Sequence, residues 1–337
     1  MTRLAAITAR LYLHFRTFRR HARKERTLLH TSSRAENPHP LAEASTGRLH
    51  SEESHQRLIA RKNLSDTVAD VAAQNIPLDI NEVASFLACQ DIKDLPNAGA
   101  VDCTVICASS VLYQAETLFK VLEANPTFTR RLVLAGGKGH STQLLWDAVR
   151  RHPKYHTLAT QIEGLPEARL LDVILRSQYH DVKRIESQGC KVYIKDKSTN
   201  CGSNAIEVRK LLEVNNVPAP ETCALVQDPT MSRRTIASFE QAYRDSPTRP
   251  KFLGCPLLVP AVNVQGDKPV YSDQEVPTNE LWDMKRFLEL IVGEVWRLTD
   301  DGNGYGPRGR GYISRVEVPE SVQEGAARIA KTYAVTR

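Results

Sequence analysis

The sequence predicts an α/β protein with a parallel sheet, helices on both faces of that sheet, and a smaller, mainly helical C-terminal lobe. Two observations lead to this prediction. Short apolar runs alternate with segments of helical periodicity up to about residue 245, and proline becomes frequent beyond that point. Strand–helix repetition is typical of a parallel sheet, because each crossover helix carries the chain back to the end of the sheet where the preceding strand began. With 337 residues, 41% of them hydrophobic, the chain can form two lobes with a substantial core.

The expected elements follow from this alternation. The predicted strands are residues 101–108, 131–135, 191–195, 222–227 and 251–259. The predicted helices of the sheet region are residues 111–124, 141–151, 167–179, 203–215 and 231–243, and one long helix is expected at 279–299. Before the first strand, helical patterning places Leu64, Val68 and Val71 on one face, and a short helix carries Ile80, Val83, Phe86 and Leu87.

These elements divide the chain into four parts. Residues 1–57 are a disordered basic leader and linker, and residues 58–98 are N-terminal helices. Residues 99–245 are the α/β core, and residues 246–337 are the C-terminal lobe with a loop rich in glycine and arginine.

The leader carries the whole net charge of +6, because residues 1–60 contain 11 Lys and Arg against 5 Asp and Glu. Residues 1–24 hold seven basic and no acidic residues, with Leu4, Ile7 and Leu11 on one helical face. This composition is typical of a mitochondrial transit peptide, and an unstructured extension is the alternative. The compartment is accordingly the cytoplasm or the mitochondrion.

The rest of the chain balances at 34 basic and 34 acidic residues, so we expect no nucleic-acid partner. No apolar run approaches the roughly 20 residues that span a bilayer, so no transmembrane segment is expected. The seven cysteines are scattered without a Cys-x-x-Cys pair. This pattern indicates neither a disulfide framework nor a zinc site, and it fits a reducing compartment.

A glycine turn follows the predicted strand 131–135. The run is Gly136-Gly-Lys-Gly-His-Ser-Thr142, and it opens a helix. Glycine lets backbone approach a ligand closely, and free N–H groups at a helix start favour an anion. Gly136, Gly137 and Gly139 are therefore candidate binding residues, with a plain turn as the alternative. His140 is the candidate catalytic acid or base, with a surface histidine as the alternative.

Two further polar turns occupy equivalent places after the strands 191–195 and 222–227. Asp196-Lys-Ser-Thr-Asn-Cys-Gly-Ser-Asn204 offers Thr199, Asn200 and Asn204 as hydrogen-bonding residues, although such side chains also satisfy turns and helix caps. In Asp228-Pro-Thr-Met-Ser-Arg-Arg-Thr235, Asp228 can cap a helix. One of the two adjacent arginines is expected to face the cleft, because their directions differ by about 100° on a helix.

A fourth cluster lies at Asp300-Asp-Gly-Asn-Gly-Tyr-Gly-Pro-Arg-Gly-Arg310. Arg308 and Arg310 could hold an anion or pair with the acids of the chain itself, and Tyr305 could stack on a planar ring. Parallel sheets bind ligands where strand ends meet helix starts. The four clusters therefore predict one small-molecule cleft.

These clusters, in this order, resemble the YdcF-like family of bacterial proteins, which includes a cytoplasmic member that binds S-adenosylmethionine. The similarity covers about residues 65–320 and includes His152-Pro-Lys-Tyr155. Ser203 stands where the family usually has glutamate. The resemblance implies a Rossmann-like sheet with S-adenosylmethionine in a cleft between two lobes. It implies these cleft residues: Gly136, Gly137, His140, Glu167, Asp196, Thr199, Asn200, Asn204, Asp228 and Arg233.

Three functions remain open from the sequence. The first is a small-molecule binding protein that takes S-adenosylmethionine, with methyl transfer by positioning alone as an extension. The second is a hydrolase or transferase that acts on an anionic metabolite, with His140 as acid or base and with Arg233 and Arg308 as anion clamps. The third is a regulator without catalysis.

Overall fold

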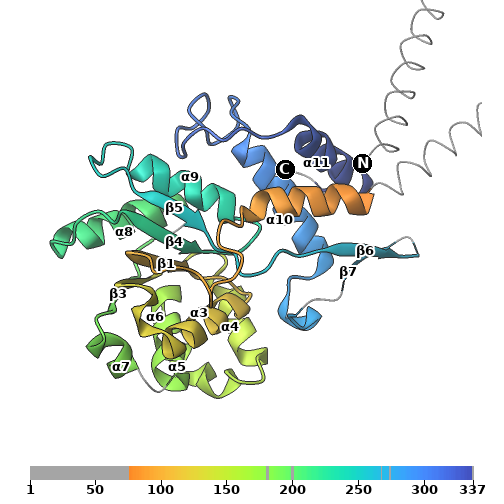
Figure 1. Cartoon of the computed structure of the whole chain (residues 1–337). Coiled ribbons are helices and arrows are strands. Elements are labelled where there is room, and N and C mark those ends of the chain that lie inside the picture. The colour runs from red at the N-terminus through yellow and green to blue at the C-terminus, as the bar shows by residue number, and fades with distance from the viewer. Residues whose placement is uncertain (1–75, 180–181, 199–200, 267, 273–274, 336–337) are drawn as a thin grey trace, which may run out of the picture. The chain divides into compact units, whose positions relative to one another are not determined.

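A five-stranded parallel sheet forms the centre of the computed structural model (Figure 1). The structure describes residues 76–335 except 180–181, 199–200, 267 and 273–274. The strands run in the order β3-β2-β1-β4-β5, and every neighbouring pair is parallel. Their bounds are β1 Cys103–Cys107, β2 Arg131–Ala135, β3 Lys191–Lys195, β4 Thr222–Val226 and β5 Lys251–Gly254. The predicted Rossmann-like α/β fold is confirmed.

The side chains on the two faces of the sheet pack in two separate hydrophobic cores, because successive side chains of a strand point in opposite directions. On β1, Ile106 packs with the first core, whereas Val105 packs with the second. Such strands, buried on both faces, read as continuous apolar runs. This is why the sequence locates them well.

Helices cover both faces (Figure 1). The first core is closed by α3 (Tyr113–Ala124), α4 (Thr142–Arg151), α6 (Glu167–Gln178) and α7 (Val182–Ser187). A short helix, α5 (Ala159–Ile162), and the 3-10 turns η1 (Pro126–Phe128) and η2 (His156–Leu158) join them. The second core is closed by α8 (Cys201–Val214) and α9 (Ser232–Ala242).

A third core belongs to the helical lobe and unites the two ends of the described chain. The helix at residues 76–88, orange in Figure 1, packs there with α10 (Met284–Leu298) and α11 (Glu320–Thr332). Asp79 of the first helix is 5% exposed and accepts two hydrogen bonds of 2.8 Å from Arg328 of α11. The helical lobe therefore includes residues from before the sheet as well as after it.

Several expected boundaries shift for local reasons. The strand expected at 251–259 ends at Gly254, shortly before Pro256, which has no N–H to donate. The long helix begins at Met284 instead of residue 279, because the Asp283 side chain caps it by accepting from Arg286 N at 2.9 Å. A 3-10 turn, η3 (Thr278–Glu280), precedes it.

The sequence analysis did not anticipate α5, α7, α11 or the hairpin of β6 (Val262–Gln265) with β7 (Lys268–Tyr271). The leader and the patterning at Leu64, Val68 and Val71 lie outside the described residues. Among the helices that the structure describes, none combines the length and the apolar character that a bilayer crossing requires.

The strand order places a topological switch point between β1 and β4. From β1 the chain builds β2 and β3 on one side, and β4 and β5 then extend the other side. The loops after β1 and β4 leave toward opposite faces, because α3 packs on the first core and α9 on the second. A crevice at the carboxyl ends of the strands is expected there.

Candidate ligand-binding cleft

A cavity of about 1010 Å³ lies at the carboxyl ends of the strands, between these ends and the helical lobe. Residues that follow the strands form one wall, including Ala108, Gly137 and Asn204. Residues of α10 and of the loop beyond it, including Glu294 and Tyr312, form the other wall. The cavity is at the upper end of the size range of small-molecule sites, which is roughly 300–1,000 Å³.

The glycine turn after β2 is held in place by close backbone packing. A Cβ on Gly137 would lie 1.8 Å from the Ser198 carbonyl oxygen, so only glycine fits against the turn that precedes α8. Gly136 has φ +155°, and its N–H donates to Lys195 O at 3.0 Å. Gly137 and Gly139 reach the cavity wall, whereas Gly136 is buried among protein atoms.

Glu167 begins α6 and presents a partly buried carboxyl group to the cavity. Its Oε1 accepts a hydrogen bond of 2.9 Å from the Thr142 hydroxyl, which also accepts from Gly139 N at 2.8 Å. Burial raises the pKa of Glu167, and the hydrogen bonds from Thr142 and Ser141 oppose that rise. The group can therefore interact with a cationic or hydrogen-bond-donating part of a ligand.

The N-terminus of α8 also faces the cavity, through Gly202, Ser203 and Asn204. The Asn204 side chain is 7% exposed, and its Oδ1 has no hydrogen-bond partner among the described residues. A buried acceptor without a partner costs about 1–3 kcal/mol, so a ligand N–H or O–H at this point would be stabilised. The predicted residues Thr199 and Asn200 lie outside the described residues.

His140 is exposed and lines the cavity from the loop before α4. Its position agrees with the expectation that it faces the cleft. Asp196, at the end of β3, is not part of the wall, and its Oδ2 accepts from Arg169 Nε at 2.8 Å.

On α9 the two adjacent arginines do face different surroundings, and the structure places Arg234 at the cavity instead of Arg233. Arg233 Nε donates to Phe86 O at 2.5 Å, and its guanidinium lies 4.0 Å from the centre of the Phe86 ring. Arg233 therefore binds the helix at 76–88. Its side chain leaves α9 about 100° away from that of Arg234, which faces the cavity.

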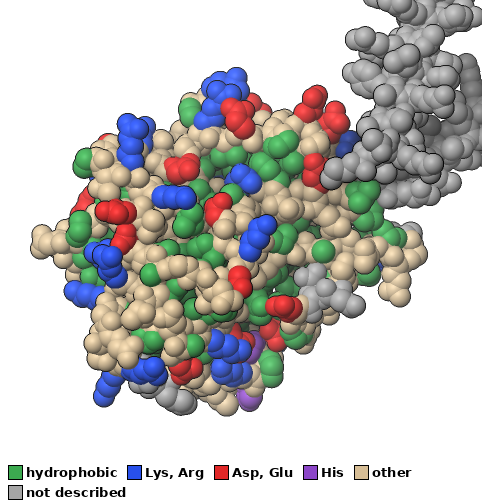
Figure 2. Space-filling view, in the orientation of Figure 1, with side chains coloured by type: hydrophobic (Ala, Val, Ile, Leu, Met, Phe, Trp, Pro, Cys, Tyr) green, Lys and Arg blue, Asp and Glu red, His purple; other side chains and the backbone are tan. Residues whose placement is uncertain are grey.

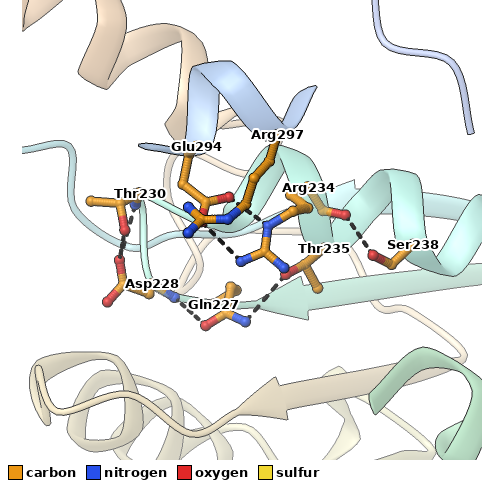
Figure 3. A network of polar contacts seen from close by, with 8 residues as sticks. All are labelled: Gln227, Asp228, Thr230, Arg234, Thr235, Ser238, Glu294 and Arg297. Atoms are coloured by element: carbon orange, nitrogen blue, oxygen red, sulfur yellow. Dashed lines mark hydrogen bonds and ion pairs between the residues drawn. The ribbon is translucent and has the colours of Figure 1, made fainter. Parts of the chain in front are cut away.

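Arg234 takes part in a buried charge network that joins the two lobes (Figure 3). Its Nε and Nη2 donate to Glu294 of α10 at 2.5 and 3.0 Å. Glu294 is 2% exposed and also accepts from Arg297 Nη1 at 3.0 Å. All three residues line the cavity. The sequence analysis missed Glu294 and Arg297, and the available signal was a carboxylate between the apolar positions Ile291 and Val295.

Charges of both signs line the cavity wall. Five arginines contribute, namely Arg209, Arg234, Arg244, Arg286 and Arg297. Four acidic residues contribute, namely Glu167, Asp245, Glu289 and Glu294. On the face drawn in Figure 2, Lys and Arg side chains are likewise interspersed with Asp and Glu. Most of these charges pair with one another: Arg209 with Asp245, Arg286 with Glu289, and both Arg234 and Arg297 with Glu294. A ligand that carries both signs would therefore share these partners with the protein's own ion pairs.

Asp228 lies in the turn after β4, next to the turn after β1, and is not part of the cavity wall. It is 2% exposed and accepts hydrogen bonds from Ser109 Oγ at 3.0 Å and from Thr230 N and Oγ1 at 3.0 and 2.6 Å. Burial raises the pKa of Asp228 to about 6, and these hydrogen bonds limit the rise. Asp228 thus joins the turns after β1 and β4, while its neighbour Gln227 reaches the cavity.

The loop at 300–310 contributes to the cavity through Tyr305 alone. Arg308 Nε donates to Asp300 Oδ2 at 3.1 Å, and both residues line a separate depression of about 440 Å³. Arg310 lies 5.8 Å from the centre of the Tyr305 ring. The two predicted anion clamps therefore interact with the loop itself, which is the alternative that the sequence left open.

No protein-family model matches the sequence.

Proposed function

We propose that the chain binds a small molecule carrying both positive and negative groups in this cleft, with S-adenosylmethionine as the specific candidate. The main support is the cavity of about 1010 Å³ at the switch point, whose wall combines arginines and acidic residues. The resemblance to the YdcF-like family suggests the identity of the ligand. S-adenosylmethionine would supply an activated methyl group.

The chemistry of the wall fits such a molecule. Asn204 Oδ1, which has no partner among the described residues, can accept from an amine or hydroxyl of the ligand. Glu167 can interact with a cationic group, and the arginines of α9 and α10 can interact with a carboxylate. The role of the protein would be to bind and orient the ligand, because positioning lowers the entropic part of a reaction barrier.

Isothermal titration of the full-length protein with S-adenosylmethionine tests the proposal. We expect saturable heat with the wild type and about fivefold weaker binding with Asn204→Ala, because one buried hydrogen bond contributes about 1 kcal/mol. Asn215→Ala is the matched control, since Asn215 is exposed at the other end of α8 and bonds Leu211 O. Absence of heat at high protein concentration would remove S-adenosylmethionine as the ligand.

A second candidate is a hydrolase or transferase that acts on an anionic metabolite. The observation in its favour is that Arg234 and Arg297 share one cavity with exposed His140. Arg234 here takes the part that the sequence analysis gave to Arg233. Turnover of a generic phosphoester or ester should disappear in His140→Ala and persist in His156→Ala, which changes another exposed histidine. No turnover in the wild type would argue against this candidate.

A further inference from the structure

Two large apolar side chains remain exposed on the walls of the cleft. Ile206 of α8 is 50% exposed, and Tyr312 of the helical lobe is 57% exposed. A single exposed apolar side chain on a convex surface needs no explanation. Here, however, one such residue from each lobe lines the same concave cavity, where a ligand can cover both.

The Tyr312 ring has a well-supported position. Its backbone N–H donates to Tyr305 O at 2.9 Å, and its ring packs edge-on against the Tyr305 ring at 5.4 Å and 70°. The flanking residues bind α9, since Gln241 Nε2 donates to Gly311 O at 3.2 Å and Ser314 N donates to Ala237 O at 3.0 Å. The exposed ring is therefore held in place before a ligand arrives, which reduces the entropy that binding would cost.

We propose that Tyr312 and Ile206 bind a planar aromatic ring of the ligand, of the size of a purine. This inference rests on the proposed small-molecule binding and adds which side chains of the cleft would contact the ring of the ligand. An aromatic face and a branched aliphatic side chain both offer apolar surface to a flat ring, and every such ring presents a π face for stacking. The polar residues Asn204, Glu167 and Arg234 would then contact the charged part of the same molecule.

The test uses the full-length protein and three probes. Adenosine carries a ring without charge, L-methionine carries the charged groups without a ring, and S-adenosylmethionine carries both. The variants are Tyr312→Ala, Tyr312→Phe and Ile206→Ala. Val214→Ala is the control, because Val214 is 81% exposed on the same helix and does not line the cavity. Dissociation constants are measured by ligand-observed NMR, and thermal unfolding confirms that each variant is folded.

We expect Tyr312→Ala to weaken adenosine and S-adenosylmethionine about tenfold or more, as loss of a stacking contact does, and to leave L-methionine unchanged. Ile206→Ala should act in the same direction, and Tyr312→Phe and Val214→Ala should bind as the wild type does. The ring site would be overturned if Tyr312→Ala bound all three probes as tightly as the wild type does. It would also be overturned if this variant weakened the binding of all three probes equally. Binding of L-methionine without adenosine would overturn it while leaving small-molecule binding intact. Failure of all three probes with the wild type would overturn both.

Discussion

Replacement of Glu294 by alanine should destabilise the folded protein strongly. The carboxylate is 2% exposed, and the side chain of its bidentate partner Arg234 is only 11% exposed. Removing one member of a buried ion pair typically costs about 3–5 kcal/mol, because the remaining charge has lost its partner without regaining water. The second partner, Arg297, is 40% exposed, so its bond to Glu294 should add about 1 kcal/mol at most.

The assay measures the unfolding of the full-length protein, by calorimetry and by urea titration. For a body of this size, a loss of about 3–5 kcal/mol corresponds to a fall in Tm of roughly 6–20 °C. Arg297→Ala is the matched control and should lower Tm by only a few degrees. The double variant Arg234→Met with Glu294→Leu should recover most of the loss, because apolar residues of similar volume can replace a buried pair.

A Glu294→Ala variant that loses no more stability than Arg297→Ala would refute the reasoning. In that case the carboxylate would be hydrated in solution, and the two lobes would be joined mainly by their apolar contacts. A double variant that is less stable than Glu294→Ala alone would refute the second step, in which the charge left behind causes the loss.

Two other predictions concern a buried acid and a loop glycine. Asp228 has a pKa of about 6 in the folded protein against an ordinary value of 3.8, so the folded state binds more protons between these values and its stability falls as pH rises through that window. Unfolding free energies of the wild type, measured from pH 4 to 7, should show that fall, up to about 3 kcal/mol. The Asp228→Asn variant should show a flatter dependence on pH. The same slope in this variant as in the wild type would contradict Asp228 as the origin. Gly304→Ala should destabilise the protein by more than about 2 kcal/mol, because its Cβ would lie 1.7 Å from Thr299 O, whereas Gly302→Ala, with no atom within 4 Å, should be nearly neutral. Equal Tm values for the two variants would show that the loop adapts.

The sequence predicted the sheet well because its information is local. The strands 131–135 and 191–195 agree with β2 and β3 at both ends, since each is an apolar run that a turn terminates. The hairpin of β6 and β7 was missed because each strand has only four residues and only Val262 is buried, so the apolar alternation at 262–265 is too short to stand out. Pro269 within it also argues against a strand, although it lies in a two-stranded edge where that is tolerated.

The site was predictable only in part, because helix phase and tertiary pairing decide which side chains reach it. Gly137, His140 and Asn204 reach the cavity from turns that the sequence identifies directly. The choice between Arg233 and Arg234 depends on one step of helix rotation. Glu294 is the one charged residue among the buried positions of the amphipathic helix α10, and nothing local indicates that an arginine from α9 meets it.

The shared core of the helix at 76–88 with α10 and α11 bears on how the chain folds during synthesis. The first of these helices leaves the ribosome before the sheet, and α11 leaves last. The sheet can therefore fold as a unit while the helix at 76–88 still lacks the partners for its apolar face. In topological terms the sheet is inserted into the helical lobe, so a fragment that begins at residue 246 would lack one side of its own core.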